Sequence, residues 1–313
     1  MGSPVRETTV NHVKFNKLCG MLQKKFVSLP ANCNNNRKKT KQPATMKKHI
    51  LDLNVRAATM VHERYVLLRL SDHGRALPPM APGQFVEVRI DGATPAFLRR
   101  PISICYADSK ANELWLLVAA VGEGTRWLTT LRPGDRLNCV LPLGNGFNTE
   151  TEKSSHTTAS ATTPLHPLLV GGGVGVAPLL YLGATLHKAG AEPVFLLGAR
   201  RKDDLLLIEE FSRYGQVNVT TEDGSKGQRG FVTDHSMLKS PQFSNIYTCG
   251  PTPMMKAVAR YASKQGIGCQ ASLENMMACG LGACLCCVEK TRRGNLCVCK
   301  DGPVFDTKEL MWQ

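Results

Sequence analysis

The sequence predicts a protein of the β plus α/β class, made of an antiparallel β-barrel, a parallel-sheet α/β domain and a small cysteine-rich C-terminal domain. Two changes of pattern along the chain support this prediction. Short apolar segments separated by turn signals occupy residues 50–147, and strand-like and helix-like segments alternate beyond residue 165. The third observation is the crowding of cysteines near the end, since seven of the 12 cysteines lie from Cys269 onward.

The amino-terminal segment carries most of the net charge of +14. Residues 1–48 hold eleven Lys or Arg against a single acid, Glu7, and show no regular apolar period. We therefore expect residues 1–45 to be a disordered basic extension. A transit peptide or a basic nucleic-acid arm stays possible, but Met46 directly precedes the first strand-like segment, which favours an upstream extension that the fold does not need.

The remaining composition is that of an ordinary globular chain, with 42% hydrophobic residues and no apolar run long enough to span a membrane. Five cysteines outside the C-terminal group are scattered without a paired framework, which favours a reducing, cytoplasmic compartment over a disulfide scaffold. Neither a membrane nor nucleic acid is expected as a partner.

The barrel is predicted over residues 46–148. Its strand-like segments include PPMAPGQFVEVRI, RRPISICYA, ELWLLVAAVG and DRLNCVLPLG, and regularly spaced short strands of this kind are typical of small antiparallel barrels. Residues 149–164 (TETEKSSHTTASATTP) are polar and rich in Ser and Thr, as expected of a linker loop. Residues 165–266 then alternate between strands and helices, which predicts a parallel sheet that binds a nucleotide.

The C-terminal region, residues 267–313, contains a cysteine pattern typical of an iron–sulfur ligand loop. Cys279, Cys284 and Cys287 have the C-x4-C-x2-C spacing of plant-type [2Fe-2S] proteins, and Gly280, Gly282 and Ala283 provide the small residues that such a tight loop requires. This predicts a [2Fe-2S] ferredoxin-like domain. Zinc is the alternative, although structural zinc sites favour two short cysteine pairs. By spacing alone, either Cys297 or Cys299 can supply the fourth thiolate, and Cys286 does not fit the pattern.

Two turns of the α/β domain are candidate ligand sites. The segment LLVGGGVGVAPLL places Gly171, Gly172, Gly173 and Gly175 between a strand and a helix, where backbone amides can cradle a pyrophosphate. Such turns also occur for packing alone, and the segment does not match G-x-G-x-x-G. In NIYTCGPTPMM, Cys249-Gly250 ends a strand at the sheet edge where open α/β sheets bind ligands, although Cys249 can equally be a small buried hydrophobe.

Two barrel segments are candidates for holding a phosphorylated cofactor. LRRPISI places two cations and the Ser103 hydroxyl on a strand, and GEGTRWL places Gly124 and Thr125 at the start of a short helix. A solvated strand edge explains Arg99 or Arg100 alone equally well.

Together these segments resemble a known family. RPIS, GEGT, GGGVGVAP, TCGP and the cysteine loop follow the order seen in ferredoxin reductase-like flavoproteins, over about residues 47–313. More narrowly, SLENMMACGLGACLCCV followed by LCVCKDGPVFDTKEL resembles the electron-transfer subunits of bacterial NAD-dependent (class 1B) dihydroorotate dehydrogenases. In that family the last ligand precedes a DGPVF segment, which favours Cys299 as the fourth ligand.

The resemblance implies FAD in the barrel, with Arg100 on the pyrophosphate and Ser103 near the flavin ring. The wider superfamily often has an aromatic residue where this chain has Ile102, so stacking on the flavin from this position is not expected. NAD is expected over the glycine-rich turn and near the TCGP segment. The implied cofactor-binding residues are Arg100, Pro101, Ile102, Ser103, Leu117, Val118, Ala119, Gly124 and Thr125 for FAD, and Gly171, Gly172, Gly173, Gly175, Pro178, Cys249 and Gly250 for NAD.

The implied function is that of half an enzyme in pyrimidine biosynthesis. A separate FMN-containing catalytic subunit oxidises dihydroorotate, and electrons pass through the cluster and FAD to NAD+, in a heterotetramer of two plus two subunits. A reductase subunit of a hydrogenase or of a ferredoxin:NADP oxidoreductase is the nearest alternative, and a flavin-free metal-binding protein is a second. The sequence does not distinguish NAD from NADP.

Overall fold

The computed structural model describes residues 47–72, 74–91, 97–149, 165–239 and 242–312. From Met46 onward the chain forms one compact unit. The extension expected over residues 1–45 and all but the first residue of the expected linker lie outside the described residues. Among the described helices, none combines the length and the apolar composition that crossing a membrane requires.

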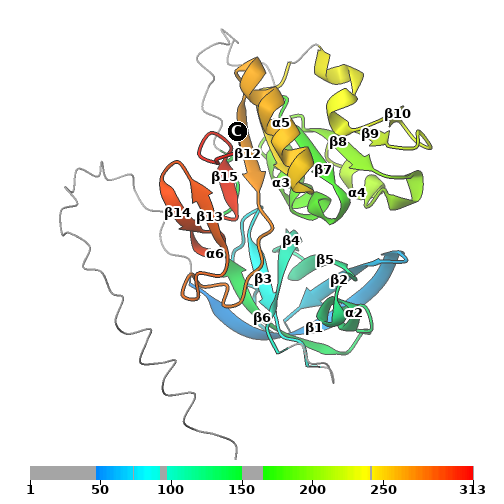
Figure 1. Cartoon of the computed structure of the whole chain (residues 1–313). Helices are drawn as coiled ribbons and strands as arrows, with labels where there is room; N and C mark the ends of the chain where they lie inside the picture. The colour runs from blue at the N-terminus through cyan, green and yellow to red at the C-terminus, as the bar shows by residue number, and fades with distance from the viewer. Residues whose placement is uncertain (1–46, 73, 92–96, 150–164, 240–241, 313) are drawn as a thin grey trace, which may run out of the picture. The chain divides into compact units, whose positions relative to one another are not determined.

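The first half of this unit is a closed antiparallel barrel with the strand order β1-β2-β5-β4-β3-β6, which confirms the predicted barrel (Figure 1). In the first half of β1, Leu53 and Val55 are buried while the residues on either side of them are more exposed, because successive side chains point to opposite faces. A short helix, α2 (Glu123–Leu128), follows the fifth strand. The strands are β1 (His49–His62), β2 (Tyr65–Ser71), β3 (Phe85–Val88), β4 (Arg100–Asp108), β5 (Glu113–Ala119) and β6 (Arg136–Leu143).

The second half is a seven-stranded sheet with the order β10-β9-β8-β7-β11-β12-β15. The sheet is parallel except for its last strand, β15, which pairs antiparallel with β12. The central strand β7 is buried along its whole length, as expected for a strand covered on both faces. The strands are β7 (Leu168–Gly172), β8 (Val194–Ala199), β9 (Gln216–Thr221), β10 (Gln228–Arg229), β11 (Asn245–Cys249), β12 (Gly268–Ser272) and β15 (Val304–Asp306).

Helices connect these strands and cover the sheet. The longest, α5, ends at Gly266, whose φ of +69° is the left-handed conformation that glycine adopts at low cost. In α3 the proline of the first turn removes only an amide that the helix would leave unpaired. The helices are α3 (Ala177–Lys188), α4 (Ile208–Ser212) and α5 (Thr252–Gln265), with 3-10 turns η1 (Gly173–Val176), η2 (Lys202–Asp204), η3 (Val232–Asp234) and η4 (Ser236–Lys239).

The C-terminal region is attached to the sheet rather than separate from it. The hairpin of β13 (Val288–Thr291) and β14 (Gly294–Cys297) and the short helix α6 (Val298–Asp301) follow the cysteine loop. However, β12 and β15 of the same region extend the sheet, so the sheet crosses the expected boundary at residue 266. The reason is that β12 completes a strand–helix–strand unit with β11 and α5, which the cysteine pattern does not reveal.

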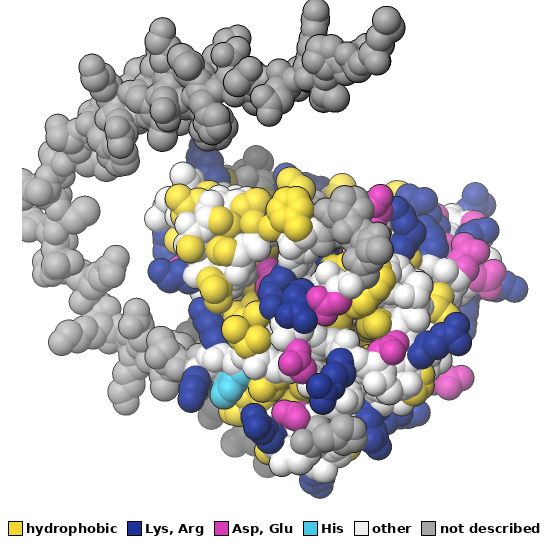
Figure 2. Space-filling model, turned by 90° about the horizontal axis from the view of Figure 1, so that it is seen from below, with side chains coloured by type: hydrophobic (Ala, Val, Ile, Leu, Met, Phe, Trp, Pro, Cys, Tyr) yellow, Lys and Arg dark blue, Asp and Glu magenta, His cyan; other side chains and the backbone are white. Residues whose placement is uncertain are grey.

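The barrel and the sheet are joined by an apolar contact through α3, which packs on β4. One buried cluster contains Leu67 and Leu117 of the barrel together with Leu179 of the helix. The hydroxyl of Tyr181 also donates a hydrogen bond to the carbonyl of Met80 at 2.9 Å. On the face shown in Figure 2, side chains of both charges are interspersed rather than gathered into one basic patch.

Candidate functional site

Three cavities lie in a row where the barrel meets the sheet. We call them the barrel cavity, of about 520 Å³, the central cavity, of about 370 Å³, and the sheet cavity, of about 560 Å³. The barrel and central cavities share Val174, Leu273, Glu274 and Asn275 in their walls. The central and sheet cavities share Tyr65, Gly172, Gly173 and Pro251. Each cavity is therefore adjacent to the next, and each has the size of a small-molecule site.

The barrel cavity collects most of the residues expected to bind FAD. Two of the expected residues stand behind its wall: Val118 is fully buried in the barrel core, and Gly124 is buried below the guanidinium of Arg100. A Cβ at Gly124 would lie 3.0 Å from the Arg100 Nε, so the glycine makes room for that side chain. The expected residues that do line the cavity are Arg100, Pro101, Ile102, Ser103, Leu117, Ala119 and Thr125.

Arg100 is held at the edge of this cavity by its own strand. Its Nη1 donates to the carbonyls of Leu98 at 2.7 Å and Arg99 at 3.2 Å. Among the described residues no carboxylate pairs with Arg100, so its charge is available to an anionic group. The backbone at the start of α2 is organised by Thr125, whose hydroxyl oxygen accepts from the amides of Val121 and Gly122 at 3.0 Å. Arginine and amide donors next to an apolar cavity suit a phosphorylated flavin.

The glycine-rich turn and the TCGP segment are packed together backbone to backbone in the central cavity. A Cβ at Gly175 would lie 2.4 Å from the Gly250 Cα, and a Cβ at Gly250 would lie 2.8 Å from the Gly172 carbonyl oxygen. Gly172, Gly173, Gly175 and Gly250 all line cavity walls. Only glycine permits this approach, which leaves bare main chain facing the cavity.

Three residues expected near NAD do not reach the cavities. Gly171 and Pro178 are buried at the end of β7 and in the first turn of α3. Cys249 is fully buried at the end of β11, where burial and then the charge of Glu274 raise the pKa of its thiol well above the usual value. Of the two interpretations of Cys249, a residue at a ligand site or a small buried hydrophobic residue, the structure therefore agrees with the second.

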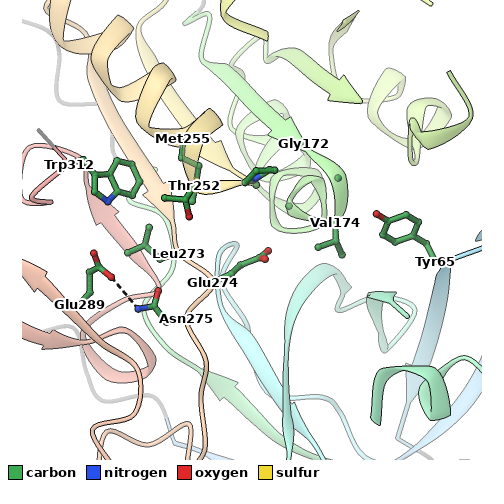
Figure 3. Close-up of a pocket in the computed structure, with 14 residues that line it drawn as sticks. Tyr65, Gly172, Val174, Thr252, Met255, Leu273, Glu274, Asn275, Glu289 and Trp312 are labelled. Atoms are coloured by element: carbon green, nitrogen blue, oxygen red, sulfur yellow. Dashed lines mark hydrogen bonds between the residues drawn. The ribbon is translucent and has the colours of Figure 1, made fainter. Parts of the chain in front are cut away.

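Glu274 lies at the junction of the barrel and central cavities, and the motif analysis did not single it out. Figure 3 shows it between Val174 and Asn275, with Tyr65 and Trp312 at opposite ends of the central cavity. Desolvation by the surrounding protein raises the pKa of its carboxyl. Next to it, the Asn275 amide donates to Glu289 at 3.1 Å, which fixes this side of the wall. The segment SLEN was visible in the sequence, but only the packing of barrel against sheet brings it here.

The cysteine loop brings the four expected iron ligands together as two pairs. In the first pair, the sulfur of Cys279 accepts hydrogen bonds from the thiol of Cys284 and from the amides of Leu281, Ala283 and Cys284. Burial opposes ionisation of Cys279, but these hydrogen bonds outweigh it and lower the pKa of its thiol to about 6. In the second pair, burial and then a hydrogen bond to Cys287 raise the pKa of Cys299 to about 12.

The thiol that lies beside Cys287 is that of Cys299. The amide of Cys299 donates to the Cys287 sulfur at 3.3 Å, and the amide of Gly282 donates to the Cys299 sulfur at 3.0 Å. Burial does not separate these cysteines, because Cys297 lies in the same apolar group as Cys287 and Cys299, and Cys286 is exposed like Cys284. The sulfur contacts do separate them, and the amide of Cys297 donates to the Asp301 carboxylate rather than to a sulfur. Among the described residues no three His, Cys, Asp or Glu side chains converge on one point, as a single ion would require. Two thiol pairs match a cluster in which each of two irons takes two thiolates.

A buried acid lies between the cysteine loop and the barrel cavity. Glu87 of β3 is 1% exposed, and within the described part of the chain neither carboxylate oxygen has a hydrogen-bond partner. On β4 it is paired with Pro101, which lines the barrel cavity, and its side chain contacts Gly280 of the loop. Burial raises the pKa of Glu87 to about 7, against the opposing charge of Arg99.

Comparison with protein families finds two matching models. Residues 169–260 match the oxidoreductase NAD-binding domain, and residues 274–311 match the iron-sulfur cluster binding domain of dihydroorotate dehydrogenase B. The first match contains the glycine-rich turn and the TCGP segment, and the second contains the whole cysteine loop.

Similar proteins match three quarters or more of this chain. The electron transfer subunit of dihydroorotate dehydrogenase B (NAD(+)) from Lysinibacillus sphaericus is 41% identical over 244 residues, which are 76% of this chain and 90% of the relative. The subunit of the same name from Geobacillus kaustophilus is 38% identical over 263 residues, 83% of this chain and 97% of the relative. Among solved structures, the NADH-dependent reduced ferredoxin-NADP oxidoreductase is similar with a TM-score of 0.72 and 29% identity, over 83% of this chain and 90% of that one.

Proposed function

This chain belongs to the family of dihydroorotate dehydrogenase B electron transfer subunits, and on that premise we propose that it passes electrons from a dihydroorotate-oxidising partner through a [2Fe-2S] cluster and FAD to NAD+. The observation that carries the proposal is the row of three adjacent cavities where the barrel meets the sheet. A flavin and a dinucleotide need adjacent sites that meet at their reactive rings, and such a row provides them.

Cys279, Cys284, Cys287 and Cys299 hold the cluster. The support is their arrangement as two thiol pairs, together with the amides of Leu281 and Gly282 that donate to Cys279 and Cys299. Amide donors of this kind stabilise negative charge on sulfur and so favour the reduced cluster. Zinc, the alternative from spacing, would need four ligands around one point.

FAD occupies the barrel cavity, with Arg100 and the α2 amides near Thr125 on its phosphates and Ser103 toward its ring. The support is the unpaired charge of Arg100 at the cavity edge and the ordered turn before α2. Ile102 offers an aliphatic wall here, so the ring is held by packing and hydrogen bonds without an aromatic partner from this position. Pro101 and Leu117 complete the apolar surface.

NAD lies over the glycine-rich turn, with its nicotinamide at the junction where Glu274 and Val174 line both neighbouring cavities. The bare backbone of Gly172, Gly173 and Gly175 faces its pyrophosphate. When bound, the flavin exchanges hydride with NAD and single electrons with the cluster, and so converts between two-electron and one-electron transfer. The residues of this chain bind, orient and separate these groups.

The catalytic partner docks beside the cysteine loop. Large apolar side chains are exposed there, including Leu281 at 46%, Leu285 at 64% and Val288 at 37%. Exposed apolar patches of this kind mark protein interfaces, and electron transfer requires the cluster to be close to the partner. The partner is an FMN-containing dihydroorotate dehydrogenase subunit, and the assembly is a heterotetramer of two plus two subunits.

The test is reconstitution with purified subunits. The chain with its FAD and cluster should reduce an artificial acceptor with NADH but should not oxidise dihydroorotate. Adding the FMN-containing catalytic subunit should create NAD-linked dihydroorotate oxidation, and light scattering should give the mass of a two-plus-two complex. Dihydroorotate turnover by the chain alone, or transfer only to ferredoxin or a hydrogenase subunit, would contradict the proposal.

A pair of matched variants tests the docking face. Leu285→Glu should abolish the complex while leaving cluster absorbance and NADH-to-acceptor activity intact, because a charge in an apolar interface is not compensated. Met60→Glu places the same charge on a residue of β1 that is 51% exposed and should leave the complex unchanged. If the two substitutions affected complex formation equally, the face beside the cysteine loop would not be the docking site of the partner.

A further inference from the structure

The sheet cavity lies beyond the glycine-rich turn, on the side away from the barrel cavity. It shares Gly172, Gly173 and Pro251 with the central cavity and extends to Gly198 and Thr220, on β8 and β9 (Figure 1). Open α/β sheets bind ligands at the carboxyl ends of such strands. A dinucleotide whose pyrophosphate crosses the glycine turn must place one half toward the flavin and the other half in the sheet cavity.

Glu222 presents a carboxylate in the wall of this cavity. It directly follows β9, and its amide donates to the Ala199 carbonyl at 3.1 Å, which fixes it beside the end of β8. Within the described ranges no cation forms an ion pair with this carboxylate. Glu222 is therefore available to accept a hydrogen bond from a ligand.

The other charges of the cavity wall are mostly engaged with one another. Asp204 is bonded to Arg64 at 3.2 Å and lies 3.7 Å from Arg201 and 3.6 Å from the His62 imidazole. Arg200 remains, at the end of β8, where its carbonyl accepts from the amide of Asp223. The cavity thus offers one unpaired carboxylate and one unpaired guanidinium at neighbouring strand ends.

Phe231 supplies an apolar face to the same cavity. Its side chain is 63% exposed, although a ring of this size is normally buried. Its backbone is fixed, since its amide donates to the Asp234 carboxylate at 2.8 Å at the start of η3. An exposed aromatic ring in a cavity wall is suited to stacking against a nucleobase.

We propose that the sheet cavity takes the adenosine half of NAD, with adenine on the Phe231 ring and the ribose 2′-hydroxyl donating to Glu222, and that Glu222 thereby excludes NADP. This rests on the proposed NAD-linked function. A carboxylate accepts a hydrogen bond from a hydroxyl, whereas a 2′-phosphate has no proton to give at neutral pH and carries like charge. Arg200 is then left to the remaining ribose and phosphate oxygens that both nucleotides share.

The test uses ADP-ribose and 2′-phospho-ADP-ribose, which contain the adenosine half without nicotinamide, and measures their binding to the FAD- and cluster-containing protein by calorimetry. The wild-type protein should bind ADP-ribose at least about tenfold more tightly. Glu222→Gln removes the charge but keeps an acceptor, so the preference should fall by about tenfold or more, through tighter binding of the phosphorylated probe. Phe231→Ala should weaken both probes by about tenfold and leave the preference unchanged.

Two further variants separate this inference from general effects. Glu209→Gln, on the exposed side of α4 and outside the cavity, changes the net charge equally and should leave both affinities unchanged. Arg200→Ala should weaken both probes alike. A wild-type preference for the phosphorylated probe, or a selective loss of that probe in Arg200→Ala, would overturn the inference while leaving NAD-linked transfer to the partner intact. Failure of both probes to bind, with NADH still reducing the flavin, would overturn it as well.

Discussion

The carboxyl group of Glu87 lies directly against the backbone of Gly280, the residue that follows the first expected iron ligand. A Cβ at position 280 would lie 2.6 Å from the Glu87 Cγ and 2.9 Å from its Oε1. Gly280 also has a φ of +64°, which favours glycine. The cysteine loop therefore packs directly against the buried Glu87 of the barrel, and there is no room for a side chain at position 280.

Gly280→Ala should lower the cluster content of the purified protein strongly. The substitution adds about 1–2 kcal/mol of left-handed strain and a clash with a side chain that is 1% exposed. Iron and acid-labile sulfide per protein, together with the visible absorption, measure the result. FAD content should change little, because the barrel cavity is lined by other segments.

Gly266→Ala is the matched control for this prediction. Gly266 has a φ of +69° but no atom within 4 Å of an added Cβ, so it carries the strain without the clash. Glu87→Ala combined with Gly280→Ala should restore part of the cluster, because the clash is then removed and only the strain remains. If the single and double variants lose the cluster equally, the contact with Glu87 does not limit the loop.

The four-cysteine ligand set predicts distinct outcomes for six serine substitutions. Cys279→Ser, Cys284→Ser, Cys287→Ser and Cys299→Ser should each remove or strongly alter the cluster spectrum, since each removes one of two thiolates on an iron. Cys286→Ser should have no effect, because Cys286 is exposed and outside the two pairs. Cys297→Ser should keep the iron–sulfur cluster but lower the stability of the protein, because Cys297 packs among buried apolar side chains. Loss of absorption in Cys286→Ser with retention in Cys299→Ser would reverse the assignment.

Much of the fold follows from local pattern, as the alternation around Leu53 and Val55 and the continuous apolar run of β7 illustrate. The position of β15 does not, because the three residues Val304–Asp306 carry no signal for joining a sheet whose first strand begins at Leu168. For the same reason, the local pattern gives no sign that β12 and β15 of the cysteine region belong to this sheet. Pairing of distant strands is a property of the packed chain.

The candidate site likewise contains some residues that the sequence indicates and others that only the folded structure reveals. Residues that act through backbone or through motif spacing, such as Gly172, Gly173 and the four cysteines, were visible in the sequence. Tyr65, Glu274 and Phe231 were not, because they have no motif of their own and line the cavities only once the segments that carry them have packed together. Conversely, Cys249 belongs to a motif but serves packing.

Gly175→Ala should disable nucleotide binding selectively. The added Cβ would meet the backbone of Gly250 at 2.4 Å and of Cys249 at 2.7 Å, so the glycine turn must move away from the end of β11. Affinity for ADP-ribose should fall by about tenfold or more, while FAD and cluster contents stay near wild type. Gly190→Ala, with a φ of +86° and open space around it, is the control and should bind normally. Normal binding by Gly175→Ala would show that the turn can move at no cost.

Glu274→Gln should stabilise the protein increasingly as the pH rises. The protein around the cavity desolvates the carboxyl of Glu274 and raises its pKa above the ordinary value of 4.5, so the folded state disfavours the ionised carboxylate. The side chain is exposed at the cavity wall, so the effect on stability should be small. The sign follows from linkage: this cost is absent below pH 4.5, develops as the pH rises through the folded pKa, and is complete above it. The melting temperature of the variant should therefore exceed that of wild type most at pH 8.5 and least at pH 4, below the ordinary pKa. Glu63→Gln removes the same charge at the exposed turn between β1 and β2 and controls for net charge. A stability difference that is constant from pH 4 to 8.5 would show that the carboxylate at the cavity junction is solvated or paired as well in the folded protein as in the unfolded chain.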